Sequence, residues 1–212
     1  MLKILILDFD GVVIESNAVK TDAFDHVFGR FPDHAAAMMA YHHSNVSMGR
    51  YGKFDHLLGL MGRSGDQTLR AELAAEFSRF VAARMMDVPF VAGALRFLAE
   101  VTPRLPVYLA SVTPIEELTQ TLASRDLLRW FRKVYGCPPW TKPDAIRDIL
   151  AVERVSPANA LLVGDSPGDQ RAAESTGVRF IARNSGLAFD APPPLQFADL
   201  EEIRIHLNHL IP

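Results

Sequence analysis

The sequence of 212 residues has a single cysteine, Cys137, so no disulfide can form within one chain. This usage suits a reducing compartment, and we expect a cytoplasmic location. Basic residues are not concentrated anywhere, and 22 Lys and Arg stand against 25 Asp and Glu, for a net charge of −3. This charge balance gives no reason to expect nucleic acid as a partner.

Long apolar runs are missing as well. The opening run from Leu2 to Leu7 is too short to cross a bilayer and leads directly into two carboxylates. We therefore expect neither a membrane partner nor a signal peptide. Hydrophobic residues make up 49% of the chain, which is enough for a substantial core. We expect a folded monomer or homodimer with one large domain, or a core that carries a smaller insert.

The opening segment, Leu2 to Leu7, is apolar apart from Lys3 and is followed by Asp8, Asp10 and Gly11. A short apolar run of this kind is typical of a strand that is buried on both faces of a parallel sheet. Ligands of such sheets bind beyond the carboxyl ends of the strands, which is where the two carboxylates fall. Two acidic side chains at alternate positions, followed by a turn glycine, indicate a bound cation, a nucleophile, or both.

The rest of the chain falls into two patterns. Residues 15–88 have helical periodicity and no strand pattern, whereas strands and helices alternate from Pro89 onward. Such alternation predicts parallel strands joined by right-handed crossovers. We expect an α/β fold with a doubly wound parallel sheet (Rossmann-like) formed by residues 1–14 and 89–212, and an all-helical insert at 15–88. The expected later strands cover residues 106–110, 134–135, 160–164 and 178–182. Pro114 opens one of the helices, with Thr113 as its expected N-cap.

Four segments carry chemically active side chains at the ends of expected strands or at the start of a helix. They are Asp8-Phe9-Asp10-Gly11-Val12-Val13, Val107-Tyr108-Leu109-Ala110-Ser111, Thr141-Lys142-Pro143-Asp144, and Gly164-Asp165-Ser166-Pro167-Gly168-Asp169. In this order and spacing they resemble the four motifs of the haloacid dehalogenase-like (HAD) hydrolases, most of which are Mg²⁺-dependent phosphatases. The helical insert after the first motif resembles the cap domain of the subgroup that includes phosphoglycolate phosphatase and β-phosphoglucomutase.

This resemblance implies a catalytic role for the two aspartates of the first motif. Asp8 would attack phosphorus and form an aspartyl-phosphate, which divides one difficult displacement into two easier ones. Asp10 would protonate the leaving alcohol and then deprotonate the water that hydrolyses the intermediate. The metal ligands for Mg²⁺ would be Asp8, Asp165 and, through its backbone carbonyl, Asp10.

The resemblance also implies which residues bind the phosphoryl group. Lys142 would place a fixed positive charge against the nucleophile and the phosphoryl oxygens. Ser111 and nearby backbone N–H groups, at Gly11 and Val112, would bind the same oxygens. Asp169 would orient Lys142 or a water on the metal.

The insert contains a polar stretch in which Arg50 and Lys53 fall on one face of an expected helix. An arginine in a similar cap loop meets the substrate in related sugar-phosphate phosphatases and mutases, so the resemblance implies that Arg50, with Lys53, binds substrate. A solvated helix start is the alternative for this stretch. His42 and His43 have no acidic or cysteine partner at metal-ligand spacing, and we expect them to be solvated or to contact substrate.

Several functions fit this sequence. The first is a phosphatase that acts on a small phosphorylated metabolite, either a sugar phosphate or a phosphoglycolate-like molecule. A β-phosphoglucomutase-like phosphomutase would use the same core residues. A 2-haloacid dehalogenase is disfavoured because those enzymes lack the second aspartate, here Asp10, and phosphonate hydrolysis would need a Schiff-base lysine such as Lys20 or Lys53. A non-catalytic metabolite-binding protein of this fold is the alternative from another class, and the complete set of motif residues counts against it.

Overall fold

The computed structural model of the protein describes residues 1–211. The chain forms two compact units: Met1–Glu15 together with the chain from Pro89 onward, and Ser16–Val88. The two segments that join the units pair with each other inside the first unit. The N–H of Glu15 donates to the carbonyl of Pro89 at 2.9 Å, and the N–H of Val91 donates to the carbonyl of Val13 at 3.0 Å. Within residues 1–211 no helix is both long enough and apolar enough to span a membrane.

A parallel sheet organises the first unit, with the strand order β3-β2-β1-β4-β5-β6 over the described residues. The strands are β1 (Ile4–Leu7), β2 (Val107–Ala110), β3 (Lys133–Tyr135), β4 (Ala160–Gly164), β5 (Arg179–Arg183) and β6 (Gln196–Phe197). Every residue of β1, β2 and β4 is buried, which explains why these segments are uniformly apolar. The chain order reverses at β1, which pairs with β2 on one side and β4 on the other. This topology confirms the doubly wound α/β fold predicted from the sequence.

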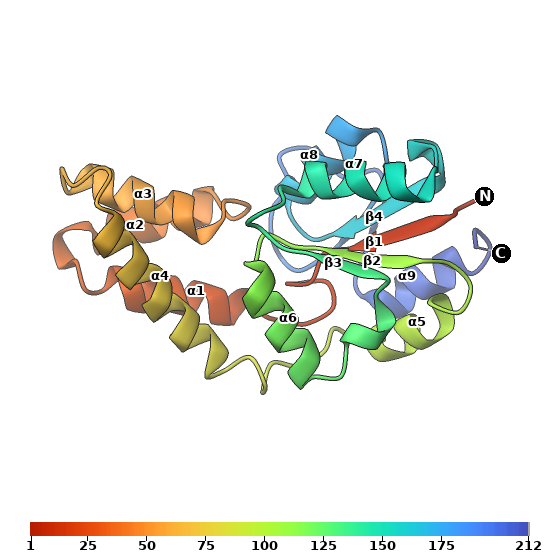
Figure 1. Cartoon of the computed structure of the whole chain (residues 1–212), viewed down its shortest axis with the longest axis horizontal. Coiled ribbons are helices and arrows are strands. Elements are labelled where there is room, and N and C mark those ends of the chain that lie inside the picture. Colours follow the sequence, from red (N-terminus) through yellow and green to blue (C-terminus); the bar gives the residue numbers. More distant parts are fainter. Residues whose placement is uncertain (212) are drawn as a thin grey trace. The chain divides into compact units, whose positions relative to one another are not determined.

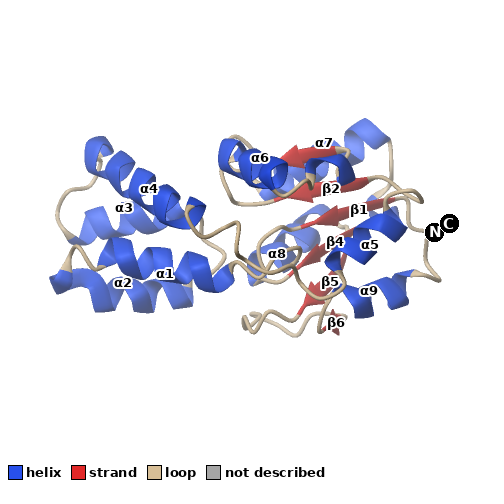
Figure 2. Ribbon diagram, turned by 90° about the horizontal axis from the view of Figure 1, so that it is seen from below, coloured by secondary structure: helices blue, strands red, loops and turns tan. Residues whose placement is uncertain are grey.

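Helices cover both faces of this sheet. They are α5 (Ala94–Val101), α6 (Ile115–Ser124), α7 (Lys142–Glu153), α8 (Pro167–Thr176) and α9 (Leu200–Leu207), with short 3₁₀ turns at Leu128–Trp130 and Pro157–Asn159. Figures 1 and 2 show α7 and α8 on one face, and α5, α6 and α9 on the other. The ligand-binding edge of such a sheet is the carboxyl end of its strands, beside the position where the order reverses.

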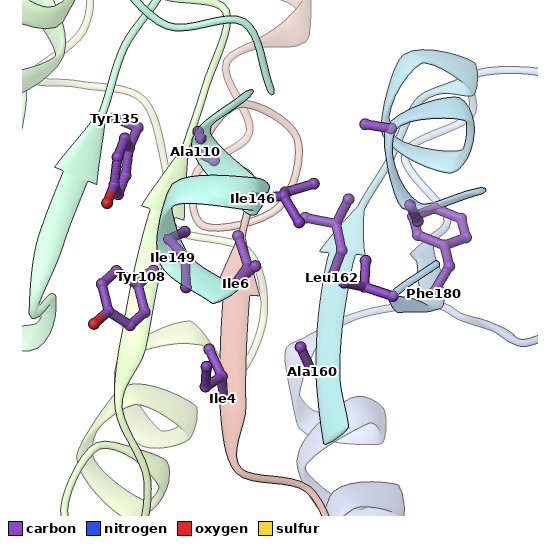
Figure 3. Packing of buried hydrophobic residues seen from close by; sticks show 14 of the residues in the cluster. Ile4, Ile6, Tyr108, Ala110, Tyr135, Ile146, Ile149, Ala160, Leu162 and Phe180 are labelled. Atoms are coloured by element: carbon purple, nitrogen blue, oxygen red, sulfur yellow. The ribbon is translucent and has the colours of Figure 1, made fainter. Parts of the chain in front are cut away.

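A buried apolar cluster joins the sheet to α7 and α8 (Figure 3). Ile4 and Ile6 of β1 and Leu162 of β4 are completely buried in it, together with Ile146 and Ile149 of α7. Burial of each such side chain contributes about 1.5–3 kcal/mol. This packing fixes β1 and β4 relative to α7, so the polar residues that follow the strands and begin the helix hold constant positions.

The second unit, Ser16–Val88, contains only helices. They are α1 (Asn17–Phe28), α2 (Pro32–Ser44), α3 (Arg50–Leu60) and α4 (Gln67–Ala82). Phe24, Phe28, Phe54 and Phe77 form its aromatic core, with ring centroids 4.6 to 6.4 Å apart. Pro32 begins α2, where the first backbone N–H groups have no partner within the helix, so its missing N–H removes no helical hydrogen bond. The unit therefore has an apolar core of its own.

Candidate active site

Asp8 follows β1 directly, and the sheet's hydrogen bonding continues up to it. Its backbone N–H donates to the carbonyl of Val163 in β4 at 2.9 Å. The residue is 6% exposed, and its Oδ1 accepts the N–H of Phe9 at 2.7 Å. Beyond Asp8 the chain turns tightly through Gly11, whose φ of +71° lies in the left-handed region that favours glycine. The strand thus delivers one buried carboxylate, and the turn brings a second one back toward β2.

That second carboxylate, Asp10, is held by hydroxyl groups that follow β2. Its Oδ2 accepts the Thr113 hydroxyl at 3.0 Å and the Ser111 hydroxyl at 3.4 Å. The N–H of Thr113 donates to the Ser111 hydroxyl oxygen at 3.1 Å, which completes a small closed network. The prediction that Thr113 caps the following helix is wrong: Pro114 occupies the N-cap position of α6, and the Thr113 hydroxyl serves Asp10 instead.

Lys142 begins α7 and bridges two carboxylates. Its Nζ lies 3.0 Å from Oδ2 of Asp8 and donates a hydrogen bond to Oδ1 of Asp169. Burial by itself would lower the pKa of this lysine, but the carboxylates of Asp169 and Asp8 together raise the pKa above its ordinary value. Lys142 therefore carries a fixed positive charge directly against Asp8.

Asp169, in the first turn of α8, has no exposed surface. Its Oδ2 accepts the N–H groups of Asp165 at 3.2 Å and Ser166 at 3.1 Å, and the Ser166 hydroxyl at 2.7 Å. Ser166 and Asp169 thereby form the capping box of α8. With Lys142 on Oδ1, this carboxylate accepts hydrogen bonds from four donors. Asp169 therefore ties the lysine to the loop that presents Asp165.

The carboxylates crowd together in a way that suits a hard divalent cation. Oxygens of Asp8, Asp165 and Asp169 lie within 4.8 Å of one another. Burial raises the pKa of Asp8 well above its ordinary value, the neighbouring aspartates raise it further, and Lys142 opposes them only in part. A cation such as Mg²⁺ prefers oxygen ligands and lowers the pKa of the groups that bind it. Because Asp169 already accepts four hydrogen bonds, Asp8 and Asp165 are the better ligands.

Comparison with known sequences decides the family. The sequence model described as haloacid dehalogenase-like hydrolase matches residues 5–183, most of the chain. The chain belongs to this family. Among curated proteins, sequence comparison finds no match.

Solved structures with the same fold align over nearly the whole of this haloacid dehalogenase-like hydrolase. A protein from Clostridium acetobutylicum, named as a predicted phosphatase, has a TM-score of 0.79 at 16% identity and covers 99% of each chain. A Haemophilus somnus protein, named as a predicted phosphoglycolate phosphatase, has a TM-score of 0.78 at 14% identity, covering 98% of each chain. A HAD-type hydrolase from Bacillus subtilis, solved with bound magnesium, has a TM-score of 0.70 at 19% identity, covering 98% of this chain and 99% of that one. Identities this low establish the shared fold.

The site residues expected from the HAD resemblance divide between the two units: the motif residues lie in the first, and Arg50 and Lys53 lie in the second. The first unit brings together Asp8, Asp10, Ser111, Lys142, Asp165 and Asp169, with Gly11 in the turn after Asp10 and Val112 directly after Ser111. Val112 is 40% exposed, so its side chain is available to solvent. The role of each residue stays a prediction.

Arg50 and Lys53, the expected substrate-binding residues of the hydrolase's insert, both lie on α3 of the second unit. The guanidinium of Arg50 lies 4.4 Å from the ring centroid of Phe77 and donates to the Ser78 hydroxyl at 2.8 Å. Lys53 is 1% exposed. Both side chains are therefore held in defined positions, and their contact with substrate stays a prediction.

Lys53 shares its buried environment with His42. Its Nζ lies 2.9 Å from Nδ1 of His42 and 4.5 Å from the ring centroid of Phe24. Burial lowers the pKa of Lys53 to about 7, and burial together with the charge of Lys53 lowers the pKa of His42 to about 4. Of the two alternatives predicted for His42, the solvated one is wrong, because the residue is 6% exposed and packs between α1 and α3. Its contact with substrate stays a prediction.

Sequence reasoning missed two features of this family member. One is the contact of the Thr113 hydroxyl with Asp10, and the other is the ion pair of Arg183 with Glu15. Arg183 ends β5, is 8% exposed, and forms an ion pair with Glu15. A charged residue directly after the apolar run Phe180-Ile181-Ala182 was the available signal, because it marks the carboxyl end of a strand. Its partner could not be found from the pattern, since the two residues are 168 positions apart in the sequence.

Proposed function

We propose that this hydrolase is a Mg²⁺-dependent phosphatase that acts on a small phosphorylated metabolite, a sugar phosphate or a phosphoglycolate-like acid, through an aspartyl-phosphate at Asp8. The observation that carries the proposal is the buried pair of Asp8 and Lys142 among further aspartates at the sheet's carboxyl edge. A carboxylate that attacks a phosphate dianion meets like charge. Fixed positive charge beside the nucleophile reduces that repulsion, and Lys142 supplies it.

The reaction has two displacements at phosphorus. An oxygen of Asp8 attacks phosphorus while the bond between phosphorus and the alcohol oxygen breaks, and Asp10 in its acid form gives its proton to the departing oxygen. Asp10, now a carboxylate, takes a proton from water as that water attacks the aspartyl-phosphate. Inorganic phosphate leaves, and Asp8 and Asp10 return to their starting forms. The hydroxyl contacts of Thr113 and Ser111 support this role by orienting Asp10.

Mg²⁺, with Asp8, Asp165 and the Asp10 backbone carbonyl as its ligands, would supply neutralising charge for the phosphoryl oxygens. Lys142, the Ser111 hydroxyl and the N–H group of Val112 bind these oxygens and orient the phosphoryl group. The N–H of Gly11, expected from the resemblance to join them, instead donates to the carbonyl of Ile14 at 2.8 Å. Asp169 keeps Lys142 in place through its hydrogen bond.

The Ser16–Val88 unit acts as the cap domain that selects the leaving group in this proposal, with Arg50 and Lys53 meeting the substrate. The charged side chains buried within the described part of this unit are basic, Arg50 and Lys53 beside His42. Basic groups are complementary to the anionic substrates of a metabolite phosphatase.

The experiment that tests the function is phosphate release from a panel of small phosphate esters, with and without Mg²⁺. Asp8→Asn is the variant, and Asp144→Asn, an exposed aspartate at the start of α7, is the matched control. We expect release from a few related esters that is lost in Asp8→Asn and with EDTA but kept in Asp144→Asn. Isomerisation of a sugar phosphate without release of inorganic phosphate would change the assigned function from phosphatase to phosphomutase. If the protein is folded and binds Mg²⁺ but shows neither activity, the proposal that it is an enzyme is rejected.

A further inference from the structure

Arg183, at the end of β5, reaches across to the turn that carries Asp10. Its Nη1 donates to the carbonyl of Gly11 at 3.2 Å and to Oε2 of Glu15 at 2.9 Å, while Nη2 donates to Oε1 of Glu15. Its Nε donates to the carbonyl of Ala198 at 3.1 Å, which fixes the guanidinium from behind. The planar fork of donors in arginine suits this set of acceptors, whereas a lysine could satisfy only part of it.

Gly11 and Glu15 stand at the two ends of the turn. The N–H of Gly11 donates to the carbonyl of Ile14 at 2.8 Å, and Asp10 forms an isolated bridge with the same residue. One peptide bond separates Asp10 from Gly11, so a shift of the Gly11 carbonyl moves the Asp10 side chain. Arg183 grips both ends of the turn, while Thr113 holds the Asp10 carboxyl group itself.

We infer that Arg183 is a positioning residue: by clamping Gly11 and Glu15 it aims Asp10 at the oxygen of the leaving alcohol. The inference rests on the proposed function, in which Asp10 is the general acid. None of the four motif segments contains Arg183 or Glu15. Arg183 can hold the turn whether Asp10 is protonated or ionised, because its contacts are with Gly11 and Glu15 and not with the Asp10 carboxyl group.

A residue that aims the acid has a kinetic signature that a general structural role lacks. An acidic phenol such as p-nitrophenol departs with little help from a proton, whereas phenol is more basic and needs one. The ratio kcat/KM covers the steps up to departure of the alcohol and excludes the later hydrolysis of the aspartyl-phosphate. Comparing p-nitrophenyl phosphate with phenyl phosphate by kcat/KM therefore isolates the acid step.

The test compares Arg183→Met with Arg179→Met, an exposed arginine on the same strand, at saturating Mg²⁺. Asp10→Asn is the reference for complete loss of the general acid, whose contribution to the rate is about 10²–10⁴-fold. We expect Arg183→Met to lower kcat/KM about 10-fold or more on phenyl phosphate and less than about 3-fold on p-nitrophenyl phosphate, a fraction of the Asp10→Asn effect. Arg183→Lys should fall between Arg183→Met and the wild type, and Arg179→Met should match the wild type.

Equal losses on both esters, or no loss on either, would overturn the inference. If Arg183→Met does not fold, Arg183→Lys and Glu15→Gln carry the same comparison, and the absence of a preferential loss on phenyl phosphate in both would overturn it. Failure of the proposed function looks different. In that case Asp8→Asn keeps its activity, or Asp10→Asn affects both esters equally, whatever Arg183→Met does.

Discussion

Single residues set the charge balance of the site, and Asp169 links Lys142 to the loop that follows β4. It accepts hydrogen bonds from Lys142, Asp165 and Ser166 with no exposed surface of its own. In Asp169→Asn the amide NH₂ would face either the lysine or the N–H donors, which leaves a buried donor without an acceptor. We expect kcat to fall about 10–100-fold. Asp144→Asn is the matched control, and unchanged kcat in Asp169→Asn would contradict the role assigned to it.

Gly164, at the end of β4, permits the close approach of Asp169. A Cβ on this residue would lie 2.3 Å from Cβ and 2.4 Å from Cγ of Asp169. Gly164→Ala should therefore lower the free energy of unfolding by about 1–3 kcal/mol and reduce activity by displacing the carboxylate from Lys142. Urea unfolding measures the first effect.

The control for this substitution is Gly59→Ala in α3, where the nearest atom, Oγ of Ser64, is 3.9 Å away from the added Cβ. An alanine inside a helix should raise stability by about 0.5–1 kcal/mol. Equal effects of the two substitutions would mean that Gly164 has no special packing requirement.

Motif residues could be predicted one by one because they end strands or begin helices, and the carboxyl ends of parallel strands meet at one edge. The contacts that hold Asp10 and its turn could not. Whether the Thr113 hydroxyl caps α6 or serves Asp10 depends on the direction of one side chain after β2. The contact of Arg183 with Gly11 depends on the position of β5 in the sheet, because the two residues are 172 positions apart in the sequence.

At the scale of elements, α2 and α3 meet at a buried pair of titratable groups, His42 and Lys53. The pKa of Lys53 is about 7 in the folded chain against 10.5 ordinarily, so the unfolded chain binds more protons between these values. Stability should therefore fall as pH drops from 10.5 to 7. His42 has a pKa of about 4 in the folded chain against 6.5 ordinarily, so stability should fall further as the pH drops from 6.5 to about 4.

Replacing Lys53 by Met should remove the fall in stability between pH 10.5 and 7. It should stabilise the protein by about 2 kcal/mol near neutral pH, with less effect in strong alkali. Thermal unfolding across pH 6 to 10.5 measures this. Lys3→Met, at an exposed position, is the control. A wild-type stability that does not change with pH above 7 would contradict the lowered pKa of Lys53.

Elements with a continuous apolar run could be predicted, as the buried strands β1, β2 and β4 were. No expectation covered β6 or α9. β6 has two residues, too few for an alternating pattern. α9 did carry a signal: its N-cap Asp199 accepts the N–H of Glu202 at 2.9 Å, and Leu200, Ile203 and Leu207 are buried at helical spacing.

For the whole molecule, the account predicts that Mg²⁺ couples to folding. A cation bound to Asp8 and Asp165 in the native state alone should stabilise the protein by about 2.7 kcal/mol at a concentration 100 times its Kd. Thermal unfolding at increasing Mg²⁺ should show a rise in Tm that is lost in Asp165→Asn and kept in Asp190→Asn, a control at an exposed position. A similar rise in both variants would place the ion elsewhere.

Asp8 is the nucleophile in the proposed reaction, and chemical trapping of the aspartyl-phosphate identifies the residue that carries the phosphoryl group. Borohydride reduces an acyl phosphate to an alcohol, so quenching the enzyme during turnover and adding borohydride should convert Asp8 to homoserine. Peptide mass spectrometry would locate the change. The account predicts homoserine at position 8, only with Mg²⁺ and substrate present. Homoserine at Asp10 or Asp165 instead, or continued hydrolysis with Asp8 unmodified, would contradict it.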